Sequence, residues 1–154
     1  MLVEPSDRKK TGTTTRWKPD IEVFTDINIP ESYFLDILRR QAVVNAGVTF
    51  RFRAQHGAKF ETTEFCYKNG IADYVAELAG ESPLTQPYYI ETERKGKDRE
   101  DKPEYKVRMS AAFCFSNKTQ LLEYYHNSSW LEHGGSPDKA VKTAFVAQID
   151  AYLR

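Results

Sequence analysis

The chain has 154 residues, enough for one domain with a core of its own. Hydrophobic residues make up 40% and charged residues 29%, as in ordinary soluble globular proteins. Basic and acidic residues number 22 each, so the formal net charge is zero, which argues against a general-purpose basic nucleic-acid binder but leaves room for a local basic face. No apolar run approaches the ~20 residues of a membrane-spanning helix, and the N-terminus lacks the apolar stretch of a secretory signal. We therefore expect a cytoplasmic protein with no membrane partner.

The first 47 residues predict one strand and one helix. Thr11–Trp17 is rich in β-branched residues, which favour a strand, and Pro19 ends it. A helix is expected between Pro30 and Gly47, because apolar residues recur there at helical spacing. These residues are Phe34, Ile37, Leu38 and Ala42. The adjacent arginines Arg39 and Arg40 fall on the opposite face, where we expect them to meet solvent.

The next segment predicts a hairpin followed by a short helix. Val48–Ala54 alternates apolar and polar residues, as a half-buried strand does. Phe60–Tyr67 has the composition of the returning strand, with a turn at His56-Gly57-Ala58 between them. Apolar residues from Ile71 to Leu78 then follow a helical period, and Gly80 ends that helix.

The C-terminal half predicts three strands and a helix. Strands are expected at Tyr88–Arg94, Glu104–Phe115 and Leu121–Asn127. The charged run Lys95–Pro103 carries both signs and predicts a solvated loop or hairpin tip. The last helix is expected over Pro137–Arg154. Since the strands come in hairpins rather than alternating singly with helices, the order indicates an α+β fold with a mixed or antiparallel sheet and helices packed on one face.

A double-glycine turn precedes the last helix. Gly134 and Gly135 permit backbone angles that a side chain disfavours. Ser136 is expected to cap the helix by accepting from its first free amides, with Pro137 at the first helical position and Asp138 at the favourable end of the helix dipole. The same amides are suited to holding an anion, but capping is the simpler interpretation.

The reactive side chains form no recognisable catalytic or metal-binding pattern. His56, His126 and His133 lack the further ligands at fixed spacing that a metal site needs, and His56 lies in a turn where we expect it to be solvated. Cys66 and Cys114 each stand between aromatic residues of predicted strands, which favours two buried, reduced thiols over a disulfide. We predict no catalytic and no metal-binding residue in this chain.

Basic side chains on two predicted strands suggest a surface that faces DNA. Arg51 and Arg53 share one face of their strand, and Lys106 and Arg108 share one face of another. If these strands are neighbours and the face is open, the four cations form a patch that tracks phosphates. The alternative is that each face is simply solvated.

Four stretches, taken in order, resemble a known family. The first comprises Thr11-Gly12-Thr13, Trp17, Pro19, Asp20 and Phe24. The second is the helix-to-strand junction Val44-Asn45-Ala46-Gly47 with Val48–Arg53, and the third comprises Phe65, Tyr67, Gly70-Ile71 and Tyr74-Val75. The fourth comprises Asn127, Gly134-Gly135-Ser136 and Ala151-Tyr152. This ordered set resembles the second, transducer domain of the B subunit of DNA gyrase and of its topoisomerase IV counterpart.

The resemblance implies a fold shared with domain 2 of ribosomal protein S5. It implies that residues 1–26 are a strand and linker from a preceding ATPase domain, and that residues 27–154 are the transducer domain, truncated at its C-terminal end. The implied function is to relay ATP binding and hydrolysis to DNA strand passage in a type II topoisomerase. ATP and Mg²⁺ belong to the parent protein, and the implied partners are DNA, the ATP-binding and cleavage domains of the same chain and an A-type subunit.

No catalytic residue carries over from the family to this chain. The Q-T-K loop, through which the family's transducer reaches the terminal phosphate, has no counterpart here, and the nucleotide-binding motifs are missing as well. The fragment alone is therefore predicted to be inactive. The alternative is a stand-alone S5-like module that binds nucleic acid or a partner without enzymatic activity.

Overall fold

The computed structural model describes residues 11–154, which fall into two units, Met1–Pro30 and Glu31–Arg154. In the first unit, residues 11–30 form no helix or strand, so the strand predicted at Thr11–Trp17 is wrong. β-Branched composition favours a strand only where a second strand offers hydrogen bonds, and none pairs with this segment. A turn around Asp20 orders the chain instead, because its carbonyl oxygen accepts from the amide of Phe24 at 2.9 Å.

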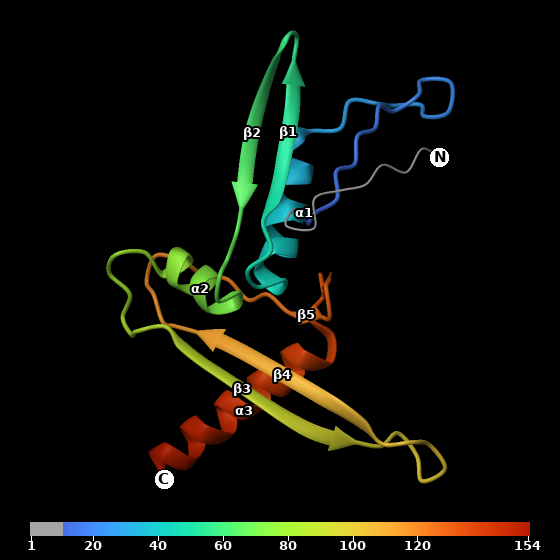
Figure 1. Cartoon of the computed structure of the whole chain (residues 1–154). Helices are drawn as coiled ribbons and strands as arrows, with labels where there is room; N and C mark the ends of the chain where they lie inside the picture. The colour runs from blue at the N-terminus through green and yellow to red at the C-terminus, as the bar shows by residue number, and fades with distance from the viewer. Residues whose placement is uncertain (1–10) are drawn as a thin grey trace. The chain divides into compact units, whose positions relative to one another are not determined.

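The second unit contains the helices and strands (Figure 1). They are α1 Glu31–Val44, β1 Phe50–His56, β2 Lys59–Phe65, α2 Ile71–Ala79, β3 Tyr88–Gly96, β4 Tyr105–Phe113, β5 Tyr125–His126, β6 Ser129–Trp130 and α3 Gly135–Leu153. The predicted α+β class is confirmed, and the arrangement is consistent with an S5-like transducer domain.

The strands pair as three antiparallel hairpins rather than as one continuous sheet. β1 pairs with β2, β3 with β4, and β5 with β6. Each pair joins strands that follow each other in the sequence, so the turns set the pairing. The strand predicted at Leu121–Asn127 is reduced to Tyr125–His126, because Asn127 adopts a positive φ of 53° and turns the chain back.

α1 lies against the β1–β2 hairpin through aromatic and small apolar side chains. Phe34 of α1 stacks on Phe52 of β1 with ring centroids 5.5 Å apart. Near the end of the helix, Ala42 and Val43 are almost fully buried and pack with Tyr67, which follows β2. This contact forms the core of the unit.

The turn into α2 approaches the end of α1 closely. The carbonyl oxygen of Tyr67 accepts from the amides of Gly47 at 2.9 Å and Gly70 at 3.2 Å. Gly70 has a φ of 57°, and a Cβ there would lie 3.0 Å from the carbonyl oxygen of Val43 and 3.3 Å from the Cβ of Ala46. Glycine is therefore required at this position for two reasons, the backbone angle and the space.

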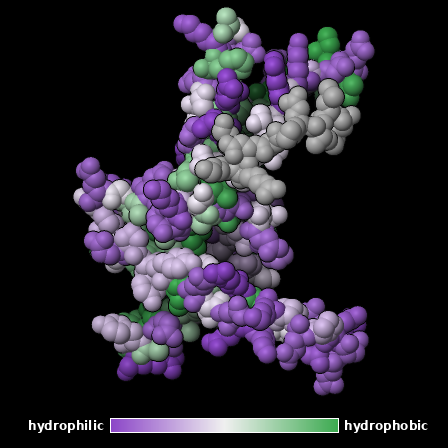
Figure 2. All heavy atoms as spheres, in the orientation of Figure 1, coloured by the Kyte–Doolittle hydropathy of each residue, from purple (hydrophilic) through white to green (hydrophobic). Residues whose placement is uncertain are grey.

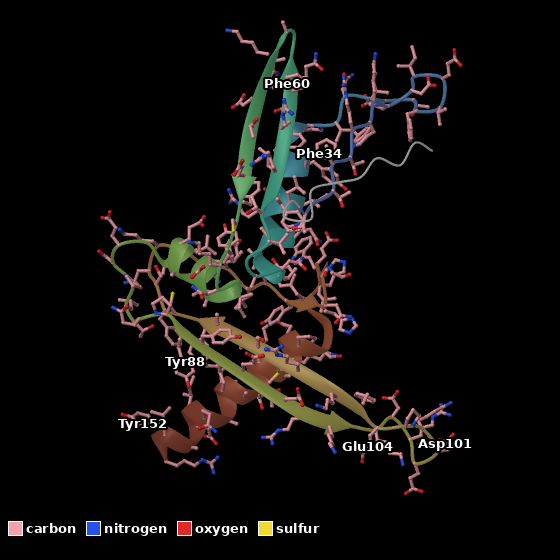
Figure 3. All side chains as sticks on the ribbon, in the orientation of Figure 1. Phe34, Phe60, Tyr88, Asp101, Glu104 and Tyr152 are labelled. Atoms are coloured by element: carbon pink, nitrogen blue, oxygen red, sulfur yellow. The ribbon has the colours of Figure 1, made fainter. Side chains whose placement is uncertain are left out.

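The β3–β4 hairpin leaves much of its apolar face accessible to solvent. Met109 is 58% exposed and Val107 45%, whereas Phe113 contacts Phe145 of α3 edge to face at 5.5 Å. Figure 2 shows hydrophobic side chains at the surface around α2 and this hairpin, while the tip between β3 and β4 is hydrophilic. Figure 3 shows Asp101 and Glu104 pointing outward at that tip, as the charged run predicts.

The prediction that both cysteines are buried is wrong. Cys66 is exposed and Cys114 is partly exposed, and both are free thiols. Since each hairpin has only two strands, alternate residues lack a second layer to cover them. None of the helices in residues 11–154 is long and apolar enough to cross a bilayer.

Replacing Gly70 with alanine tests the close approach. We expect Gly70→Ala to lower the free energy of unfolding by about 2–3 kcal/mol, because strain and crowding act together. Gly80, at the other end of α2, is the matched control, since its φ is 66° but open space surrounds it. Gly80→Ala should cost about 1 kcal/mol. Urea unfolding measures both, and equal losses would contradict the packing argument.

Candidate functional site

The four basic residues predicted to face DNA lie in two separate hairpins. Arg51 and Arg53 belong to β1, and Lys106 and Arg108 belong to β4. Because β1 pairs with β2 and β4 with β3, the expectation that their strands are neighbours is wrong. The structure thus offers two small basic faces in place of one patch, since local pairing within each hairpin takes up the strands.

Carboxylates on the partner strands neutralise three of these four cations. Arg51 Nε lies 2.5 Å from Glu64, the residue opposite it in the register. Lys106 Nζ lies 3.0 Å from Glu93.

Arg108 pairs with Glu91 on the same face of the β3–β4 hairpin. Its hydrogen bond holds the pKa of the Glu91 carboxyl below the ordinary value, and the carboxylate raises the pKa of Arg108. All these groups are well hydrated, so each pair adds little stability. Their main effect is to cancel the charge that the sequence offers to phosphates.

Arg53 is the exception among the four. Its guanidinium lies over the ring of Phe60, 4.6 Å from the centroid, and it makes no ion pair with the described residues. Phe60 is 49% exposed and stands near the free end of the β1–β2 hairpin (Figure 3). His56 at the same end is exposed, as predicted, with Nε2 3.3 Å from Glu31 and 3.7 Å from Glu61.

The double-glycine turn is present, but Ser136 does not cap the helix. Gly134 is the capping residue with a φ of 69°, Gly135 has a φ of 62°, and no side chain caps the first amides. α3 begins two residues earlier than predicted, so Ser136 and Pro137 lie inside its first turn. The predicted Ser136 cap is therefore wrong, because two consecutive glycines let the helix start before the serine.

Asp138 stabilises the first turn of α3 through Lys142. Its Oδ2 accepts from Lys142 Nζ at 2.9 Å, one turn along the helix. This hydrogen bond lowers the pKa of the Asp138 carboxyl below its ordinary value of 3.8. A carboxyl whose pKa is lower in the folded state stabilises the protein above its ordinary pKa, and that contribution is lost as the pH falls through the folded value.

Acid unfolding tests this assignment. We expect Asp138→Asn to reduce the free energy of unfolding at pH 7 and to flatten its decline below pH ~4, because the titrating group is gone. Asp150→Asn is the control in the same helix, since Asp150 also pairs with a cation one turn away, Arg154. Denaturant unfolding from pH 7 down to ~2.5 measures both variants. An unchanged acid slope in Asp138→Asn would contradict the prediction.

A cluster that the sequence did not reveal joins α1 to the β5–β6 turn. The guanidinium of Arg40 lies over the ring of Trp130, 3.7 Å from the centroid, and its Nε lies 3.9 Å from Glu123. Gln41 Nε2 donates to the carbonyl oxygen of Ser128 at 2.9 Å. We define Arg40, Gln41, Glu123, Tyr125 and Trp130 as the Arg40 cluster.

The two adjacent arginines of α1 do not simply meet solvent. Arg39, which is exposed, lies 5.4 Å from the ring centroid of Phe65, while the side chain of Arg40 is only 30% exposed. The expectation of a solvated pair is therefore wrong for Arg40. Its aromatic partner lies 90 residues away in the sequence, and helical periodicity carries no signal for such a contact.

Phenols around Glu123 stay protonated. The hydroxyl of Tyr125 donates to Glu123 at 2.9 Å, and burial together with this carboxylate raises the pKa of Tyr125. Burial and the charge of Glu123 likewise raise the pKa of Tyr74. Burial, with Glu77 nearby, raises the pKa of Tyr67 to about 12. None of these phenols is activated as a nucleophile or base at neutral pH, so the cluster is suited to holding elements together rather than to catalysis.

Comparison with known proteins identifies the family. The sequence model of the DNA gyrase B family matches residues 70–154, which is more than half of the chain. The chain belongs to the DNA gyrase B family.

Relatives that bear the name of the B subunit of DNA gyrase match nearly the whole of this gyrase B-family chain. The protein of Chlamydia pneumoniae is 28% identical over 154 residues, covering 99% of this chain and 18% of its own length. That of Mycoplasmoides gallisepticum is 27% identical, covering 96% of this chain and 23% of its own length. That of Archaeoglobus fulgidus is 26% identical, with 95% and 22% covered. The chain thus spans about a fifth of the length of these relatives, and no solved structure matches it significantly.

Proposed function

We propose that this chain is the transducer part of an ATP-dependent type II topoisomerase of the gyrase B kind. It relays the binding and hydrolysis of ATP in a preceding domain to the passage of one DNA duplex through another, by rigid-body movement between domains. The observation that carries the proposal is the match of residues 70–154 to the DNA gyrase B family, together with longer gyrase B relatives that align with nearly the whole chain.

The chemistry of the described residues supports a mechanical role. Residues 11–154 contain no group of three or more His, Cys, Asp or Glu placed to hold a metal ion, so they do not fit a Mg²⁺ site. We assign ATP and Mg²⁺ to another part of the longer protein. DNA, the ATP-binding and cleavage domains of the same chain and an A-type subunit are the proposed partners, and the cytoplasm is the proposed location.

The purified chain should not hydrolyse ATP, whereas the longer protein should. We expect no phosphate release by the chain above the buffer rate. With its A-type subunit, the longer protein should change the linking number of plasmid DNA only when ATP is present. A coupled phosphate assay and gel electrophoresis of topoisomers measure these activities. ATP hydrolysis by the chain alone, or ATP-independent strand passage, would overturn the proposal.

We further propose that Arg51, Arg53, Lys106 and Arg108 line the surface that faces the transported duplex. Ion pairs hold three of these cations in place, and Arg53 is left available by its stacking on Phe60. The paired carboxylates keep nonspecific affinity low, so DNA is able to pass without being retained. This arrangement suits a duplex in transit better than a permanent ligand.

Removing the paired carboxylates should raise DNA affinity. We expect Glu64→Gln, Glu91→Gln and Glu93→Gln together to tighten duplex binding and to steepen its logarithmic salt dependence by about 3, or about one for each released cation. The matched control removes three carboxylates elsewhere, Asp36→Asn, Glu81→Gln and Glu132→Gln. Fluorescence anisotropy with labelled duplex at several salt concentrations measures both. The same slope in the two triple variants would exclude these strands as the DNA-facing surface.

A further inference from the structure

We propose that Arg40 is a positioning residue that makes α1 and the start of α3 move together. The proposal rests on the transducer function, because it names the contact through which a displacement crosses this chain. Arg40 belongs to α1, and its partners Glu123 and Trp130 belong to the segment that leads into α3. The two sides are more than 80 residues apart in the sequence.

The geometry of Arg40 restrains its partners from two directions. Its guanidinium lies over the face of the Trp130 ring, where the ring quadrupole attracts a cation, and its Nε approaches Glu123. The Glu123 side chain is only 14% exposed and also accepts the hydroxyl of Tyr125. Because these groups are shielded from water, their attraction exceeds that of the hydrated pairs on β1 and β4.

A second contact fixes the same two elements beside the first. Gln41, the next residue of α1, donates through its side-chain amide to the carbonyl oxygen of Ser128. Ser128 lies in the β5–β6 turn, where the positive φ of Asn127 reverses the chain. Neighbouring residues of one helix therefore hold both the turn and the strand that follows it.

Short backbone hydrogen bonds connect this anchored turn to α3. The amide of Leu131, next to Trp130, donates to the carbonyl oxygen of Tyr124 at 2.8 Å. The amide of Gly134 then donates to the carbonyl oxygen of Leu131 at 3.0 Å, and α3 begins at Gly135. With so little slack between Trp130 and the helix, a displacement of α1 moves the start of α3.

Hydrogen exchange on the whole chain tests the coupling. We expect Arg40→Gln to accelerate amide exchange about tenfold in residues 125–138 and to leave the β3–β4 hairpin unchanged. Arg39→Gln is the matched control, since it removes the same charge from the neighbouring position and a contact with Phe65 instead. Arg40→Lys keeps a cation over the ring and should stay within about threefold of the wild type.

Trp130→Leu provides an independent route to the same result, because it removes the ring without altering charge. It should accelerate exchange in the same residues. Exchange in residues 125–138 that is unchanged by Arg40→Gln and Trp130→Leu, or that rises equally in Arg39→Gln, overturns the proposal. So does acceleration spread evenly over the chain, since that indicates a general loss of stability.

The longer protein separates this inference from the proposed function. We expect Arg40→Gln there to retain ATP hydrolysis but to lose at least tenfold in strand passage per ATP, with Arg39→Gln coupled normally. A wild-type protein without ATP-dependent strand passage refutes the transducer function, whatever the exchange result. A fully coupled Arg40→Gln variant of an active wild type refutes only the role of Arg40.

Discussion

The close approach of Gly70 to the last turn of α1 is the constraint on which the second unit depends. A glycine there lets the chain pass within van der Waals distance of the Val43 carbonyl, and this proximity brings Tyr67 onto Ala42 and Val43. Tyr67 supplies its ring to the core and its carbonyl oxygen to the amides of both flanking turns. A larger residue at position 70 would separate α1 from α2 and open the core between them.

With such a small core, the outer parts of the unit are held by individual contacts. The strands form two-stranded ribbons whose opposite faces differ in chemistry, with ion pairs on one side of β3–β4 and apolar side chains on the other. α3 meets that hairpin through the ring of Phe145. In a gyrase B-family protein several times longer than this chain, such a unit is suited to moving as a body between larger domains.

Local patterns in the sequence predicted the elements well where neighbouring residues determine them. Alternation identified β1 and β4, helical spacing identified α1 and α2, and the ordered motifs indicated the family before any comparison. Prediction failed where the outcome depends on distant partners. The threonines of residues 11–17 lack a pairing strand, Ser136 was displaced as a cap by the freedom of two glycines, and the contact of Arg40 with Trp130 spans 90 residues. The charges of Arg51, Lys106 and Arg108 were visible in the sequence, but the cross-strand register that neutralises them was not.

The chain contains two tryptophans, and each unit holds one of them. Trp17 belongs to the first unit and is 56% exposed, whereas Trp130 lies beneath a guanidinium in the second and is 37% exposed. Each half therefore carries its own intrinsic fluorophore, and replacing either indole with phenylalanine leaves emission from the other half alone. The molecule comes already equipped with a separate optical probe on either side of Pro30.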